Sequence, residues 1–187
     1  MAFTGAKGAS VLQATGRLGG DVDRRVNETG RFVFDVLMPG GFESGRAVRS
    51  IQKVRLLHAS VRYRVLSARR AARAPGDEVP INQEDLLGTL FCFSVVVLDG
   101  LARMGVQVTP EEADDFFHLW RVTGFVIGIR EEWLPTDIAE ARRVGDAIRA
   151  RQGASSIDGR ALARVLVEGI ERHLPARGLR LLAPGLI

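Results

Sequence analysis

The sequence predicts an all-α protein, a single-domain irregular bundle of about six helices. Apolar residues recur at the three- and four-residue spacing of one helix face along nearly the whole chain. Runs that alternate between apolar and polar residues, as strands do, are scarce, and no internal repeat occurs. The chain has 187 residues, of which 46% are hydrophobic, so it can form one domain with a substantial core.

The first two helices are expected close together along the chain. One covers residues 21–37 and ends at the Met-Pro-Gly-Gly segment of residues 38–41. The second covers residues 44–72 and ends before Pro75 and Gly76, because the residue before a proline avoids the helical conformation. Together they account for most of the first 75 residues beyond the N-terminal segment.

A third helix is expected to begin at Asn82, whose side chain can accept a hydrogen bond from the first turn. The acidic residues that follow suit the positive end of the helix dipole. The longest apolar stretch, residues 86–106, continues from this start and contains Asp99 and Arg103. Charged residues are costly within a bilayer, so we expect a buried core helix here rather than a membrane span.

The fourth helix begins at residues 109–112, Thr-Pro-Glu-Glu, which combine a threonine cap, a proline in the first turn and a glutamate three residues after the cap. It is expected to continue through residues 116–129. Gly124 and Gly128 lie four residues apart on this helix and are expected to let another helix approach closely. A fifth helix follows Pro135, and a sixth is expected at residues 158–174.

The domain organisation and location follow from composition. Residues 1–20 are rich in small residues and are expected to form a partly flexible N-terminal segment, whereas residues 21–187 form the helical domain. The N-terminus does not resemble a signal peptide, and Cys92 is the only cysteine, so no internal disulfide can form. A cytoplasmic location is therefore expected.

The chain is mildly basic, with a formal net charge of +4. The basic stretch of residues 62–74 distributes its charges around the helix, which favours a solvated helix end over a phosphate-binding patch. No nucleic-acid partner is expected, and weak peripheral attachment to anionic lipid stays open as an alternative.

His58 lies in the middle of the second expected helix, in the segment Lys-Val-Arg-Leu-Leu-His. On a helical wheel, four apolar residues fall within about 60° of it: Ile51, Val54, Val61 and Val65. Arg55 and Arg62 lie on its other flank, one turn before and one turn after. The imidazole could be half-buried and bonded to a backbone carbonyl, or it could ligate the iron of a porphyrin, with the arginines binding its propionates.

The first helix places an arginine and a hydroxyl on an otherwise apolar face. Arg25 and Thr29 share this face with five apolar residues: Val22, Val26, Phe32, Val33 and Val36. Polar groups on a core face must reach a partner or line a polar cavity. The two residues are therefore candidates for a functional site.

Four segments resemble the rubber oxygenases (latex clearing proteins) and the related membrane-associated oxygenase of mycophenolic acid biosynthesis. They occur in the family's order and span most of residues 21–145: residues 24–37, 53–65, 79–94 and 120–135. The resemblance implies an all-α fold and a b-type haem that is held through one histidine and cleaves carbon–carbon double bonds of polyisoprene with dioxygen.

Residue by residue, His58 resembles the family's iron ligand, and Arg55 and Arg62 resemble the arginines one turn on either side of it. Arg25 and Thr29 are similar to the arginine and threonine near the distal side. Glu28 stands where the rubber enzymes have a distal lysine, and no glutamate precedes it as the family's upstream glutamate would. The familiar domain is longer at both ends, so we expect this chain to be the shortened core of the fold.

The resemblance predicts a haem-b-dependent oxygenase, an oxidoreductase that acts with dioxygen on a hydrophobic, isoprenoid-like alkene. Arg25 and Thr29 would polarise oxygen or orient the substrate, and Arg55 and Arg62 would hold the propionates or the helix register. The alternative is a non-catalytic helical protein that keeps the fold to bind a ligand or partner. His118 and His173 are expected to be structural, because no histidine pair has the spacing of a zinc helix.

Overall fold

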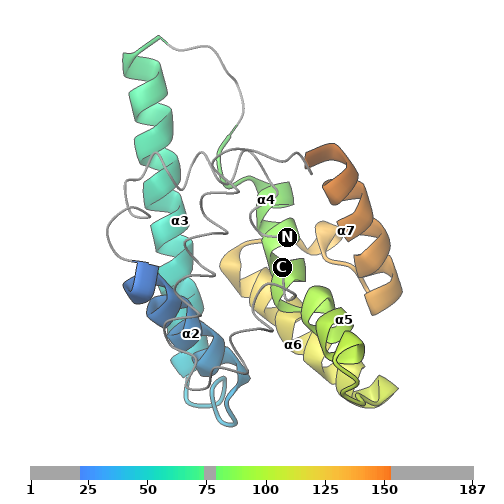
Figure 1. The fold of residues 1–187 in the computed structure, drawn as a ribbon. Coiled ribbons are helices and arrows are strands. Elements are labelled where there is room, and N and C mark those ends of the chain that lie inside the picture. Colours follow the sequence, from blue (N-terminus) through green and yellow to red (C-terminus); the bar gives the residue numbers. More distant parts are fainter. Residues whose placement is uncertain (1–21, 74–78, 153–187) are drawn as a thin grey trace, which may run out of the picture. The chain divides into compact units, whose positions relative to one another are not determined.

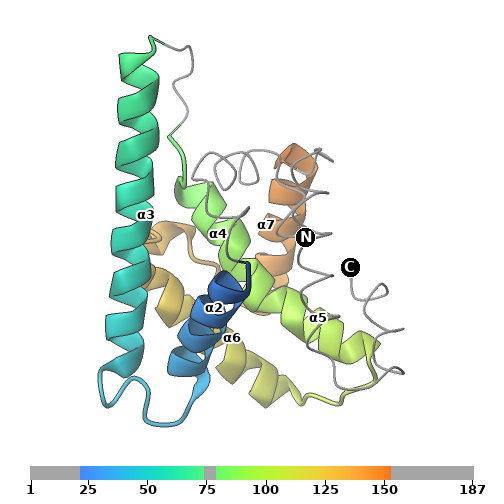
Figure 2. The ribbon, with the colours of Figure 1, turned by 60° about the vertical axis from the view of Figure 1, so that its left-hand side comes forward.

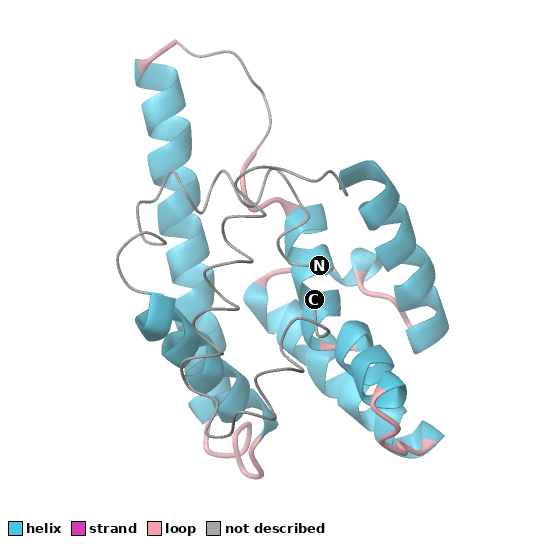
Figure 3. Ribbon diagram, viewed as in Figure 1, coloured by secondary structure: helices cyan, strands magenta, loops and turns pink. Residues whose placement is uncertain are grey.

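The structure, a computed structural model, describes residues 22–73 and 79–152. Every regular element in these two ranges is a helix, which confirms the expected all-α class (Figure 3). In chain order the elements are α2 (Val22–Leu37), α3 (Arg46–Ala71), α4 (Gln83–Phe93), α5 (Val95–Arg103), α6 (Pro110–Ile127), the 3₁₀ helix η1 (Glu131–Trp133) and α7 (Ile138–Gln152) (Figure 1).

Residues Gly30–Arg151 form one compact unit, which contains the second half of α2 and the helices from α3 onward. The first half of α2, up to Thr29, belongs to a second unit together with Gln152. The boundary expected between residues 20 and 21 lies outside the described residues and stays a prediction. So do the expected helix at residues 158–174 and His173.

Within the larger unit, α6 packs against both α3 and α4. Its Trp120, which is 2% exposed, lies in the hydrophobic core. Three phenylalanine rings surround the indole: Phe93 stacks on it at 5.2 Å between centroids, Phe116 meets it edge-on at 6.4 Å, and Phe32 is tilted at 6.3 Å. Such aromatic contacts stabilise a core beyond the area that they bury. They join α2, α4 and α6 around one side chain.

Both expected caps are present. The Asn82 side chain accepts a hydrogen bond from the Asp85 backbone N at 3.0 Å, and the Asp85 carboxylate accepts one from the Asn82 backbone N at 3.0 Å. Thr109 and Glu112 form the same reciprocal arrangement at the start of α6. The hydrogen bonds from Thr109 lower the pKa of the Glu112 carboxyl, because they favour its ionised form.

The apolar stretch after Asn82 forms two helices rather than the single one expected. The break lies at Ser94, where φ is −114° and ψ is −94°, outside the helical region. The buried Ser94 hydroxyl donates to the Leu90 carbonyl at 3.0 Å. By length and composition, Gln83–Arg103 could cross a membrane, a criterion that core helices also meet. Its Leu86, Leu87 and Leu90, as expected, are part of the core.

The two glycines of α6 serve different purposes. A Cβ on Gly124 would lie 2.7 Å from a methyl of Leu90 on α4, so this glycine does allow the close helix approach that we expected. Gly128 instead ends the helix, with a left-handed φ of 108° that side chains other than glycine rarely adopt. At Gly128 the close neighbour is the Arg55 side chain of α3, whose guanidinium carbon would lie 3.3 Å from an added Cβ, so this glycine both ends α6 and gives room to a residue of another helix.

The apolar face expected on α2 is buried only in part. Val36 is 2% exposed, and Phe32 and Val33 pack against the core. Val26, in contrast, is 45% exposed, and Thr29 is also exposed. Apolar spacing indicates which face of a helix can be buried, but not how far along that helix its partners extend.

Candidate functional site

His58 lies half-buried in the middle of α3, on the inward face that its neighbours predict. Ile51, two turns earlier, is completely buried, and Val54 and Val61 are half-buried. The Nδ1 atom of His58 is buried and has no hydrogen-bond partner among the described residues. The bond to a neighbouring carbonyl, which would make His58 a satisfied core residue, is therefore missing from the described part of the chain.

The surroundings of His58 favour the neutral form of its imidazole. Burial lowers the pKa of His58, and the positive charge of Arg62 lowers it further. A neutral imidazole has an unprotonated nitrogen, and this is the form that binds iron or another metal. Burial and charge thus keep His58 in the state that a metal ligand requires.

Arg55 joins α3 to the end of α6. Its Nη1 donates to the carbonyl of Val126 at 3.3 Å. A Cβ on Gly128 would lie 3.3 Å from the guanidinium carbon, so the glycine leaves the space that this side chain occupies. A cation at the C-terminal end of a helix is also favoured by the helix dipole.

Arg62 joins α3 to the segment that leads into α4. Its Nε donates to the carbonyl of Pro80 at 3.2 Å, and its Nη2 donates to the carbonyl of Ile81 at 2.6 Å. Ile81 has a φ of 55°, which a β-branched residue adopts only when its surroundings impose it. The guanidinium therefore stabilises a strained turn directly before the Asn82 cap.

Gln83 also holds the helices around His58 together, a role that was not predicted from the sequence. Its Nε2 donates to the carbonyl of Gly128 at 3.0 Å, and its Oε1 accepts from the backbone N of Arg130 at 2.9 Å. The partners are 45 and 47 residues away, so no local pattern could have revealed them. Together, Arg55, Arg62 and Gln83 connect α3, α4 and the end of α6.

The proposed distal residues lie in the other unit. Thr29 is exposed, and the side chain of Arg25 is outside the described part of the chain. Glu28, which the resemblance places where the rubber enzymes have a distal lysine, forms an ion pair with Arg24 at 2.8 Å. Arg25 and Thr29 belong to a different unit from His58, so their role near it stays a prediction.

Other metal-binding arrangements do not appear in the described ranges. They contain no group of three or more His, Cys, Asp or Glu side chains that could hold a metal ion. His118 is exposed on α6. Cys92 donates its thiol to the Gly88 carbonyl at 3.3 Å, and burial raises its pKa, which keeps it protonated.

A haem requires less of the protein than such a cluster does. One neutral imidazole can hold its iron, and cations can bind its two propionates. A guanidinium has five N–H groups, of which Arg55 uses one and Arg62 two in the hydrogen bonds described above. The surroundings of His58 therefore offer one imidazole and two guanidinium groups that keep unused donors, which are the group types that a haem uses.

The chain is similar to known proteins in sequence and in fold. The chain is 27% identical over 164 residues to the rubber oxygenase of Streptomyces sp. (strain K30), covering 84% of this chain and 39% of that protein. It superimposes on the closed state of the latex clearing protein LCP with a TM-score of 0.71 and 23% identity, covering 94% of this chain and 47% of LCP. The second likeness shows a shared fold, and the chain spans less than half the length of either protein.

A family comparison covers almost the whole sequence. Residues 2–187 match the family described as ER-bound oxygenase mpaB/B′/rubber oxygenase, catalytic domain. The order of the four segments in the sequence and the all-helical fold agree with this match. The chain therefore belongs to the family of mpaB-type and rubber oxygenase catalytic domains.

Proposed function

We propose that the protein is a haem-b-dependent oxygenase, an oxidoreductase that uses dioxygen to oxidise or cleave a hydrophobic, isoprenoid-like alkene. The observation that carries the proposal is the half-buried, neutral His58, whose buried Nδ1 lacks a partner among the described residues. Membership of an oxygenase family supplies the reaction class. A relative named rubber oxygenase supports an alkene as the substrate class.

Each residue has a defined part in this proposal. His58 supplies one imidazole nitrogen to the iron, and Arg55 and Arg62 hold α3 in register on either side of it. Their remaining N–H groups suit the propionate carboxylates. Arg25 and Thr29 polarise dioxygen or orient the alkene. The haem, when bound, supplies the binding and activation of dioxygen.

The visible spectrum of the purified protein tests the cofactor. The protein would be purified from haem-supplemented cells, and a pyridine haemochrome assay would count haem per chain. We expect a Soret band and about one haem per chain, as a single-histidine site implies. His58→Ala should lose the band, whereas His118→Ala, at an exposed histidine on α6, should keep it. A His58→Ala protein with a full Soret band would refute the assignment.

Activity is tested separately. The haem-loaded protein would be incubated with short isoprenoid alkenes and with polyisoprene under oxygen, and carbonyl products would be measured by mass spectrometry. Products that carry oxygen from ¹⁸O₂ support the proposal. A haem-loaded protein that yields no such products from either substrate class contradicts the alkene assignment but leaves the haem site standing.

A non-catalytic binding protein is the second candidate. One observation favours it: Arg55 and Arg62 already bind backbone carbonyls, so packing alone accounts for both side chains. A colourless, folded protein that does not take up added hemin would support this candidate.

We also propose a cytoplasmic location, because the chain's single cysteine cannot form an internal disulfide. Cell fractionation would test this location.

A further inference from the structure

The charge of α3 is entirely positive. Between Arg46 and Ala71 the helix has no Asp or Glu, and its basic residues are Arg46, Arg49, Lys53, Arg55, Arg62, Arg64, Arg69 and Arg70. Arg46 has an acidic partner, Asp35, at 3.3 Å. Arg55 and Arg62 point to carbonyls instead, on the side of the helix that carries His58. An all-cationic helix attracts an anionic partner from solution.

The opposite side of α3 forms a continuous exposed stripe. Its residues follow one another at intervals of three or four, so they share one helix face, and all are exposed: Arg49, Lys53, Leu56, Ser60, Tyr63, Ser67 and Arg70. We call this set the α3 stripe. Leu56 and Tyr63, at its centre, are 68% and 73% exposed, more than any other large hydrophobic residue that the structure describes.

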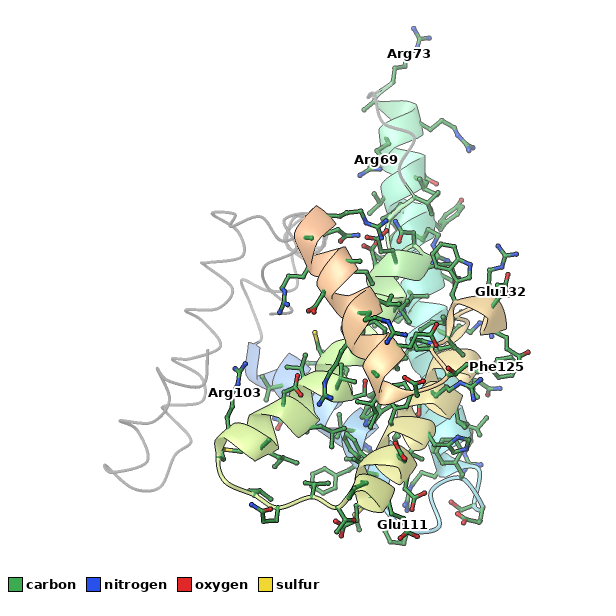
Figure 4. All side chains as sticks on the ribbon, turned by 90° about the vertical axis from the view of Figure 1, so that its right-hand side faces the viewer. Arg69, Arg73, Arg103, Glu111, Phe125 and Glu132 are labelled. Carbon is green, nitrogen blue, oxygen red and sulfur yellow. The ribbon has the colours of Figure 1, made fainter. Side chains whose placement is uncertain are left out.

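The stripe continues onto a part of α3 that other helices of its unit leave uncovered. The C-terminal end of α3 extends beyond α4, α6 and α7 in both ribbon views (Figures 1 and 2). Arg69 and Arg73 lie at this end of the helix, away from the packed part of the unit (Figure 4). The stripe residues toward this end, Tyr63, Ser67 and Arg70, are exposed and lie on a part of α3 that an external surface can reach.

We infer that the α3 stripe docks onto an anionic lipid surface, with α3 lying in the plane of the membrane. Cations at both ends of the stripe complement anionic headgroups, and Leu56 and Tyr63 between them enter the boundary between headgroups and acyl chains. Tyrosine is favoured at that boundary because its ring is apolar and its hydroxyl stays in water.

Charge and shape select lipid over other partners. A second copy of the chain would bring two positive stripes together, which like charges oppose. Nucleic acid would match the arginines, but its phosphate backbone has no place for the exposed aliphatic side chain of Leu56. A lipid surface accepts both the cations and the apolar residues of the stripe.

Docking would bring the protein to its substrate if the proposed function holds, because a hydrophobic alkene partitions into lipid. The stripe itself needs neither haem nor substrate. Vesicle binding can therefore succeed in a colourless protein and fail in an active one, so the two proposals are tested independently.

Vesicle co-sedimentation of the full chain tests the inference. Vesicles of phosphatidylcholine alone would be compared with vesicles that also contain phosphatidylglycerol. We expect about tenfold tighter binding to the anionic vesicles, weakened by added salt. Two double variants, Leu56→Ser with Tyr63→Ser and Lys53→Glu with Arg70→Glu, should each weaken that binding about tenfold. Circular dichroism would verify that each variant stays helical.

The control variant combines Arg103→Glu and Met104→Ser, which alter an exposed cation and an exposed apolar residue at the end of α5, outside the stripe. It should bind anionic vesicles like the unaltered chain. Equal binding to neutral and anionic vesicles would overturn the inference, as would stripe variants that bind like the control. Preference for duplex or single-stranded DNA in direct competition with anionic vesicles would overturn it as well.

Discussion

Gly124→Ala is expected to destabilise the protein, because the added methyl has no space. The new Cβ would lie 2.7 Å from a methyl of Leu90, 3.0 Å from one of Leu134 and 3.3 Å from one of Ile129. All three neighbours are buried in the core at 7%, 7% and 2% exposure, so none can turn into solvent. Overpacking of this kind costs about 1–3 kcal/mol.

Gly100→Ala is the matched control. Gly100 also lies within a helix, α5, and a Cβ there would meet nothing within 4 Å. Alanine favours the helix over glycine by about 0.5–1 kcal/mol, and this gain applies to both substitutions. The difference in the free energy of unfolding between the two variants therefore isolates the steric cost, which we expect to be about 1–3 kcal/mol.

The assay is urea unfolding followed by circular dichroism, with thermal unfolding as a second measurement. For a chain of this length, the steric cost corresponds to a difference in Tm of roughly 2–12 °C between the variants. If Gly124→Ala proved as stable as Gly100→Ala, the close approach of α4 to α6 at Gly124 would be refuted.

Three further predictions concern the contacts around the site and the caps. Arg62→Gln should lower the free energy of unfolding by about 1.5–3 kcal/mol in urea titrations, because it removes charged hydrogen bonds to two carbonyls; an unchanged midpoint would contradict this role. Gln83→Ala should speed hydrogen exchange of the Arg130 amide, which the glutamine oxygen now protects; unchanged exchange there would show that the bond is absent in solution. Thr109→Ala should raise the pKa of Glu112, measured by NMR titration, towards its ordinary value of 4.5. Because folding lowers this pKa, the carboxylate's contribution to stability is present above pH 4.5 and is lost as the pH falls through the lowered value. The stability of the variant should therefore depend less on pH in this acid range. Identical titration curves of Glu112 in the two proteins would refute the role of the Thr109 side chain.

Local signals in the sequence were sufficient to predict where the capped helices begin. Asn82 and Thr109 cap their helices through residues only three positions away, so both residues of each cap can be recognised in one short stretch of the sequence. The inward face of α3 was equally accessible, because the spacing of Ile51 and Val54 defines one side of a helix wherever that helix packs. Resemblance in four segments then identified the family that the comparisons show.

The sequence by itself therefore determined the helical class, the capped helix starts and the face of α3 on which His58 lies. Only the tertiary structure decided what the side chains of that face meet: Arg55 binds a carbonyl 71 residues away, and Arg62 binds carbonyls 18 and 19 residues away. It also decided that Gly128 ends a helix, and that Ser94 divides one. The physical reason is the range of the interactions, since caps and periodicity act within a few residues, whereas hydrogen bonds and packing between helices depend on how distant segments are brought together.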